Sequence, residues 1–185
     1  MSNLRTQHQT PSCVNARRYQ YLNEILMFGL FKRKATIVEF EQSKRDGTVY
    51  PGDSITVLQI QTESGQFGTA WVNRKYKDYP FKEFCPYFIV MKMDLSNIDD
   101  EQRDQPDMST IEDYFDAQLK SIGICHFIAR FVTDLGMDML FYSEANPRFE
   151  EVINELMNEN DLNLDFEVDI NENDPKWRSM KMVLG

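Results

Sequence analysis

The stretch from Tyr87 to Ile170 constrains the fold more than any other feature of this sequence, because it alternates between strand and helix patterns in a diagnostic order. It reads strand, helix, strand, strand, helix, strand. That order is typical of a split βαβ sandwich, in which two helices pack on one face of an antiparallel sheet. We therefore predict an α+β, ferredoxin-like βαββαβ domain over residues 87–185, with the first and third strands in the centre of its sheet.

The period of apolar residues places each strand of this domain. The first strand, 87–95, and the fourth, 162–170, alternate apolar and polar residues, which is typical of strands with one buried face. The middle strands, 124–133 and 137–143, are separated by the turn residues 134–136. Strict alternation along these strands predicts which side chains share each face of the sheet.

Two helices are marked by their ends. Ser109 and Glu112 form an S-x-x-E capping box at the start of the first helix, and Gly123 ends it. Asn146 and Pro147 begin the second helix as cap and first-turn residue. Both helices carry an apolar stripe at helical spacing, so we expect them to cover the same sheet.

The residues before this domain divide into a tail, 1–34, and a β-hairpin extension, 35–86. In the extension, the β-rich runs 55–63 and 67–74 are separated by a short segment with a glycine, which predicts a hairpin. The tail is expected to be disordered or to form a short helix. Met27 begins a string typical of a bacterial protein start, so we hypothesise that the residues before it come from an over-long gene prediction.

The predicted folded part of the chain is strongly acidic. The whole chain has a formal charge of −10, but residues 35–185 hold 14 basic and 29 acidic side chains, a net charge of −15. Such a surface repels phosphate backbones, so we predict no nucleic-acid partner and favour a protein partner that is basic. The cysteines have no CxxC spacing and suggest reduced thiols in the cytoplasm, and no apolar run is long enough to span a membrane.

Two patterns resemble reactive sites without fitting them. Carboxylates within 161–172 occupy the ligand positions of an EF-hand calcium loop, but Phe166 stands where the tight turn requires glycine. Cys125 and His126 are adjacent in a strand and should point to opposite faces, so they are not expected to form a thiolate–imidazole pair. We therefore predict no metal, no cofactor and no catalytic residue.

The sheet face away from the helices is the predicted interaction surface. Its centre is apolar, and an exposed apolar patch of that kind normally marks an interface. We expect the hairpin, a second subunit or another protein to cover it, with the hairpin as the first candidate. The candidate interaction residues are Lys92, His126, Arg130, Asp138, Tyr142, Asp165 and Glu167.

Three segments resemble a bacterial family catalogued as domain of unknown function 695. They are Tyr79-Pro80-Phe81 with the strand that follows, the hairpin FIARFVTDLGMDMLFYS, and the closing element Asp174-Pro175-Lys176-Trp177. That family is similar to the ribonuclease E inhibitor B family, whose members are acidic, ferredoxin-like and act by binding another protein. The resemblance implies a binding role and supplies no catalytic residue.

The sequence as a whole predicts a non-catalytic protein-binding or regulatory domain that acts through its sheet face and acidic edge. Two alternatives stay open. A symmetric apolar pocket would favour a small-ligand sensor at the interface of a homodimer, and a deep pocket around His126 would favour an enzyme. A flat or self-covered face around His126 would favour the binding domain.

Overall fold

The computed structural model describes residues 33–62, 65–94, 107–133, 136–158 and 166–185. Contacts divide the chain into a unit of residues 1–34 and a unit of residues 35–185. All described residues except 33 and 34 belong to the second unit. The predicted tail thus lies almost entirely outside the described residues, and so does Asp165.

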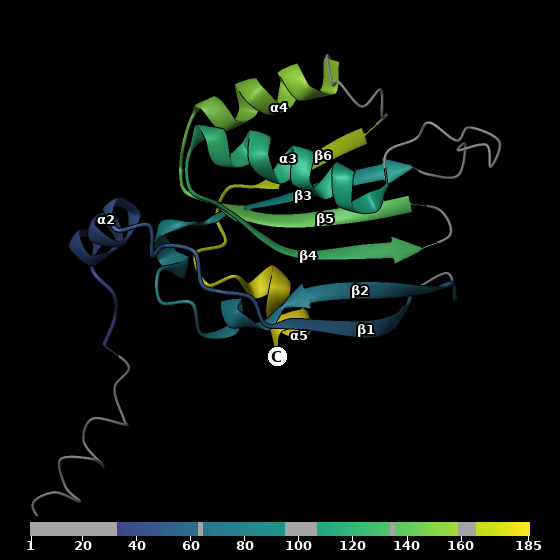
Figure 1. The fold of residues 1–185 in the computed structure, drawn as a ribbon, viewed down its shortest axis with the longest axis horizontal. Coiled ribbons are helices and arrows are strands. Elements are labelled where there is room, and N and C mark those ends of the chain that lie inside the picture. Colours follow the sequence, from purple (N-terminus) through teal and green to yellow (C-terminus); the bar gives the residue numbers. More distant parts are fainter. Residues whose placement is uncertain (1–32, 63–64, 95–106, 134–135, 159–165) are drawn as a thin grey trace, which may run out of the picture. The chain divides into compact units, whose positions relative to one another are not determined.

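The second unit is built on a six-stranded sheet in which every neighbouring pair of strands is antiparallel (Figure 1). The strands are β1 (Ile55–Gln61), β2 (Phe67–Asn73), β3 (Tyr87–Asp94), β4 (Cys125–Thr133), β5 (Gly136–Ser143) and β6 (Phe166–Asn171). Their order across the sheet is β1-β2-β4-β5-β3-β6. The predicted α+β class and the predicted hairpin, β1–β2, are confirmed.

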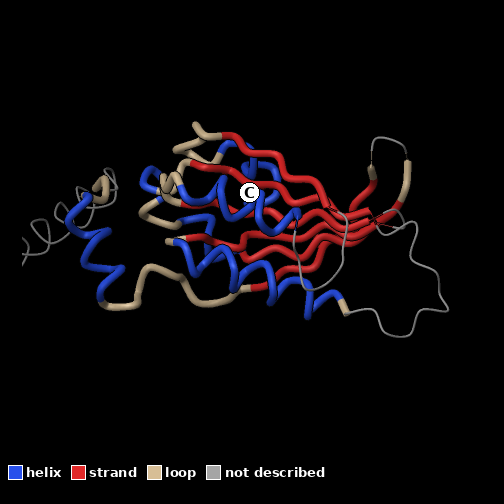
Figure 2. Tube along the Cα trace, turned by 90° about the horizontal axis from the view of Figure 1, so that it is seen from above, coloured by secondary structure: helices blue, strands red, loops and turns tan. Residues whose placement is uncertain are grey.

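The helical segments are drawn in blue in Figure 2, where most of them lie alongside the red strands. They are α2 (Ile37–Arg45), α3 (Met108–Ile122), α4 (Arg148–Asn158), the short α5 (Lys181–Leu184), and three 3-10 turns, η1 (Arg74–Asp78), η2 (Lys82–Phe84) and η3 (Arg178–Met180). Asp107 caps α3 by accepting a hydrogen bond from the Thr110 backbone N–H at 2.7 Å. The predicted Ser109–Glu112 capping box is therefore wrong, because α3 begins earlier than the box requires. None of the helices in the described ranges is both long and apolar enough to cross a membrane.

One apolar cluster joins α3 and α4 to the sheet. Its buried members are Ile111, Phe115 and Leu119 of α3, Phe149, Ile153 and Leu156 of α4, and Ile89, Met91, Met93, Cys125, Met137, Met139, Phe141 and Phe166 of the strands. The strand members recur at every second position of β3 and β5, as the sequence period predicts. Burying each large apolar side chain stabilises the fold by about 1.5–3 kcal/mol, so this cluster is a principal source of stability.

A second cluster covers part of the opposite sheet face. It consists of Phe40, Val49, Ala70, Val72, Tyr76, Tyr79, Cys85, Ile128, Ala129, Leu140, Tyr142, Trp177, Met180 and Leu184. The hairpin was the first candidate to cover this face, but β2 pairs edge-to-edge with β4 and widens the sheet instead. The covering segments are residues 40–50, the connection 74–86 and the C-terminal residues 174–184.

A bulge in β4 changes which of its side chains share a face. Phe127 pairs with Phe141 of β5, but Ala129 pairs with the adjacent Leu140, so Ile128 is an extra residue in β4. One inserted residue shifts the two-residue period and turns every later side chain to the other face. Buried Ile128 and Ala129 both belong to the second cluster as a result.

The bulge corrects the predicted position of Arg130. Strict alternation placed Arg130 on the same face as His126 and turned Phe131 toward the helices. In the structure, Arg130 Nη1 lies 2.5 Å from Glu112 Oε1 of α3, and Phe131 packs against the second cluster. Arg130 therefore points to the helix side and does not contribute to the predicted interaction surface.

Candidate functional site

His126 is enclosed by aromatic rings and has 0% exposed surface. Tyr50, Tyr76, Tyr79 and Trp177 surround it, and the Tyr79 ring is nearest, with its centroid 4.6 Å from that of the imidazole. Neither imidazole nitrogen has a hydrogen-bond partner among the described residues. Burial lowers the pKa of His126 to about 3, so the imidazole is neutral at physiological pH. In this position it does not reach a substrate or a partner.

Tyr142 is held under the C-terminal segment by Asp174. Its hydroxyl donates to Asp174 Oδ2 at 2.6 Å, while the backbone N–H groups of Arg178 and Ser179 donate to the same carboxylate at 2.8 and 2.9 Å. Burial alone would raise the pKa of Asp174, but these donors stabilise its charged form and hold the pKa below its usual value. Trp177 stacks on the Tyr142 ring, with centroids 4.2 Å apart.

We call residues 174–184 the C-terminal clasp. They close the end of the sheet face at which Tyr142 and His126 lie. The clasp covers Tyr142, and its Trp177 is one of the four rings that enclose His126; both side chains are fully buried. This corrects the predicted surface, in which the two side chains were exposed to a partner. The closing segment Asp174–Trp177 thus has a structural role, because Asp174 and Trp177 hold the clasp against the sheet face.

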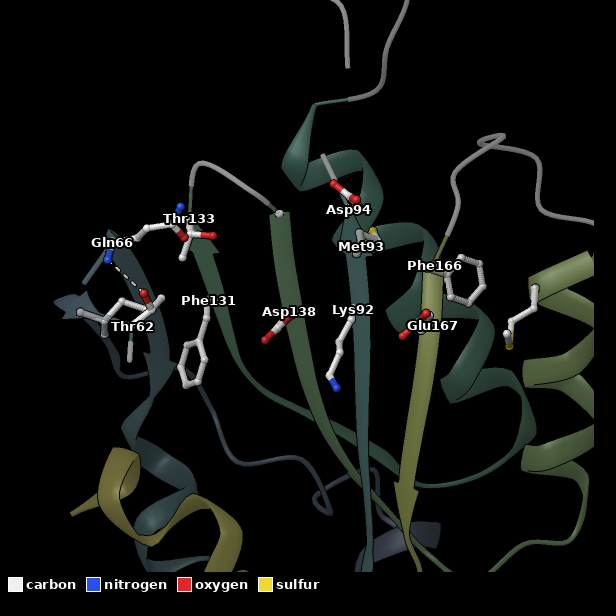
Figure 3. A pocket seen from close by; sticks show the side chains of 13 residues that line it. Thr62, Gln66, Lys92, Met93, Asp94, Phe131, Thr133, Asp138, Phe166 and Glu167 are labelled. Carbon is white, nitrogen blue, oxygen red and sulfur yellow. Dashed lines mark hydrogen bonds between the residues drawn. The ribbon is translucent and has the colours of Figure 1, made fainter. Parts of the chain in front are cut away.

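The same sheet face is open at its other end, where a hollow of about 700 Å³ lies over the strands (Figure 3). We call it the sheet-face hollow. Residues from five strands contribute to its lining, among them Ile60 of β1, Lys92 of β3, Phe131 of β4, Asp138 of β5 and Glu167 of β6. Thr62 and Gln66, at the ends of the β1–β2 hairpin, line its rim.

The charges around the sheet-face hollow are mainly negative. Strand register places Lys92 directly opposite Asp138 on one side and Glu167 on the other. Lys92 donates a hydrogen bond to Asp169, and this bond, together with the nearby carboxylates, raises the pKa of Lys92. Burial raises the pKa of Asp138, which is half-buried. One ammonium group therefore lies among three carboxylates.

A second recess, of about 320 Å³, is lined by aromatic and acidic residues next to α3, but three of its carboxylates already have partners, and one of them, Asp53, accepts a hydrogen bond from Asn73 at 3.0 Å. Glu112 pairs with Arg130, and Asp116 accepts a hydrogen bond from Lys120 at 2.6 Å. The sheet-face hollow is the stronger candidate, because it is larger and because three of the predicted interaction residues, Lys92, Asp138 and Glu167, line it.

The structure brings together only part of the predicted residue set. Lys92, Asp138 and Glu167 line the sheet-face hollow. His126 and Tyr142 are fully buried, Arg130 faces α3, and Asp165 lies outside the described residues.

Sequence reasoning missed two contributions to the hollow. It missed Phe131, because no local signal revealed the bulge that turns this ring to the hollow. It also missed Thr62 and Gln66, because pairing between β2 and β4 joins segments far apart in the chain.

The calcium-like pattern at 161–172 is only partly described. Residues 161–165 fall outside the described ranges, and residues 166–171 form β6. Asp169 of this pattern is bound to Lys92. Within the described ranges, no three His, Cys, Asp or Glu side chains are grouped so that they could hold a metal ion.

Comparisons with known proteins provide no relative from which a function could be transferred. No protein-family model matches the chain, and no curated protein or solved structure matches it significantly. We therefore infer its function from the geometry and charge of the sheet-face hollow.

Proposed function

We propose that this protein is a non-catalytic binding or regulatory domain that holds a basic segment of a partner protein in the sheet-face hollow. One observation supports this proposal most directly. The clasp closes one end of the sheet face, whereas the other end keeps a hollow lined by Asp138, Glu167 and one cation, Lys92, which is itself bound to Asp169.

The lining of the hollow suits a lysine or arginine side chain. Such side chains place their aliphatic stems on apolar surface and keep the charged head near carboxylates. Ile60 and Phe131 supply apolar surface, while Asp138 and Glu167 supply the carboxylates. The net charge of −15 on residues 35–185 would also attract a basic partner over a longer range and speed association.

The strand order also supports a ferredoxin-like fold, the fold of the binding domains that the sequence resembles. We propose that β3–β6 with α3 and α4 form a ferredoxin-like unit, to which the β1–β2 hairpin is added at the β4 edge. The order β4-β5-β3-β6 and the apolar cluster shared by both helices support this proposal. The resemblance to domain of unknown function 695 and the cytoplasmic location remain predictions from the sequence.

A basic small molecule is the second candidate occupant, because ligand pockets typically enclose about 300–1,000 Å³. The volume of the hollow, about 700 Å³, falls in this range. The enzyme alternative has less support, because its candidate residue, His126, is fully buried among four aromatic rings.

The test compares two variants that each remove two negative charges. Asp138→Asn/Glu167→Gln alters the hollow, while Glu150→Gln/Glu151→Gln alters exposed residues in the first turn of α4. Wild type and variants are used to capture partners from native lysate, and the bound proteins are quantified by mass spectrometry at low and high salt.

We expect a basic protein to bind wild type and the α4 variant equally and to bind the hollow variant at least tenfold less. Charge-assisted hydrogen bonds contribute about 1.5–3 kcal/mol each, and about 1.4 kcal/mol corresponds to tenfold in affinity. High salt should weaken the binding. Equal capture by the hollow variant, or an equal loss in the α4 variant, would contradict the proposal.

A further inference from the structure

The two edges of the sheet differ in how they are protected against pairing with another chain. Exposed edge strands usually carry charges, proline or a bulge that prevents such pairing. The β6 edge carries Glu167 and Asp169. In contrast, β1 (ITVLQIQ) has no charge and no proline, and its seven residues pair with β2 without a bulge. The β1 edge is therefore unprotected.

The outward-facing backbone groups of β1 can be assigned from its flanking hydrogen bonds. Ser54 O accepts a hydrogen bond from Arg74 N at 2.8 Å, and Thr62 N donates to Gln66 O at 2.8 Å. Because antiparallel ladders alternate, the even-numbered residues of β1 pair with β2 and the odd-numbered ones face away. The residues whose backbone N–H and C=O groups face away from β2 are Ile55, Val57, Gln59 and Gln61.

Exposed apolar side chains lie next to this edge. Val57 is 65% exposed, and Phe67 of β2 is 62% exposed. Together with Met108 of α3, they line a shallow hollow of about 660 Å³. An apolar patch continuous with an unprotected edge is characteristic of an interface.

We propose that β1 pairs antiparallel with β1 of a second copy of this chain about a two-fold axis. The distribution of charge favours a second copy of this chain over a different protein as the partner of β1. Two units of net charge −15 repel each other, and an uncharged edge is where they can approach at least cost. A basic partner, in contrast, would be drawn to the acidic surfaces and not to an edge without charge.

Two-fold symmetry also explains why the assembly stops at two copies. An isologous pair uses both β1 edges, and the remaining β6 edges are charged. Residues directly opposite in an antiparallel pair share a face of the sheet. The exposed side chains of Ile55 and Val57 from the two copies would therefore lie on the same face of the joined sheet. Such a dimer does not require the partner proposed for the sheet-face hollow.

The test measures the mass of the full chain by sedimentation over a wide concentration range, in wild type and two matched variants. Val57→Glu places a charge beside the edge, and Val38→Glu places the same charge on α2, where Val38 is 69% exposed. We expect wild type and Val38→Glu to form dimers, and Val57→Glu to raise the dimer dissociation constant at least tenfold, because each copy would then bring a negative charge to the shared edge. Circular dichroism verifies that the variants fold.

Hydrogen exchange locates the interface. The amides of Ile55, Val57, Gln59 and Gln61 should exchange more slowly as the wild-type concentration rises, and Val57→Glu should need at least tenfold higher concentration to reach the same protection. Three results would overturn the proposal. They are a monomer at all concentrations, a dimer that Val57→Glu does not weaken, and protection of these amides only when a foreign protein is bound.

Discussion

At the scale of single residues, His126 combines complete burial with unsatisfied hydrogen-bonding capacity. Neither ring nitrogen has a partner among the described residues, and aromatic rings surround it. A buried polar group without a partner costs about 1–3 kcal/mol. A phenyl ring of similar size would avoid that cost and keep the aromatic contacts.

We expect His126 to make the fold less stable as pH falls. Its pKa is about 3 in the folded protein and near 6.5 in the unfolded chain, which therefore binds the proton first. The free energy of unfolding is thus undiminished above pH 6.5 and falls by about 1.4 kcal/mol per pH unit as pH drops from there toward 3. Denaturant unfolding at about pH 7 and pH 5 should show a loss about 2 kcal/mol larger in wild type than in His126→Phe.

The comparison isolates His126 because every other titrating group is present in both proteins. Among these groups are Glu112 and Asp116, whose pKa values are raised by burial. An equal loss of stability in wild type and His126→Phe would show that the imidazole titrates normally and is not sealed from water by the surrounding rings.

At the scale of elements, the junction between β3 and β5 depends on a close backbone approach. The register places Gly136 at the start of β5 opposite Asp94 at the end of β3. A Cβ atom on Gly136 would lie 2.1 Å from the carbonyl oxygen of Met93, a backbone atom that cannot rotate away. Only glycine allows the two strands to meet here without a shift.

We expect Gly136→Ala to lower the free energy of unfolding by about 1–3 kcal/mol, because the strands must move apart. Gly52→Ala is the matched control, since a Cβ at Gly52 would have no heavy atom within 4 Å. It should be neutral or stabilise the protein by about 0.4–1 kcal/mol, because alanine restricts the unfolded chain. Chemical denaturation measures both values, and equal stability of the two variants would contradict the close approach.

At the scale of the whole second unit, the second apolar cluster joins residues on both sides of Tyr87. Phe40, Val72 and Tyr79 come from before it, and Tyr142 and Trp177 from after it. Residues 87–185 alone would lack much of this cover. The cover is needed because the sheet face beneath it is apolar.

We therefore expect residues 35–185 to unfold cooperatively at nearly the same temperature as the full chain. Residues 87–185 should show no cooperative transition and should bind a hydrophobic dye, as chains with exposed cores do. Calorimetry and dye fluorescence distinguish these outcomes. A cooperative transition in residues 87–185 would support the separate domain predicted from the sequence.

Local sequence patterns by themselves determined the class of fold and the position of most elements. The alternation in β3 and β5 and the apolar stripes of α3 and α4 are repeated within each segment, so one sequence is enough to reveal them. The capping box Thr36–Glu39, which begins α2, was also visible in the sequence, but our prediction did not use it.

Only the tertiary structure decided which part of the sheet face is closed and which is open. The extra residue Ile128 moved Arg130 away and brought Phe131 to the sheet-face hollow. Asp174 and Trp177 closed the face over Tyr142. Both effects depend on partners far away in the chain. Periodicity reports which residues are apolar, whereas long-range pairing determines what covers them.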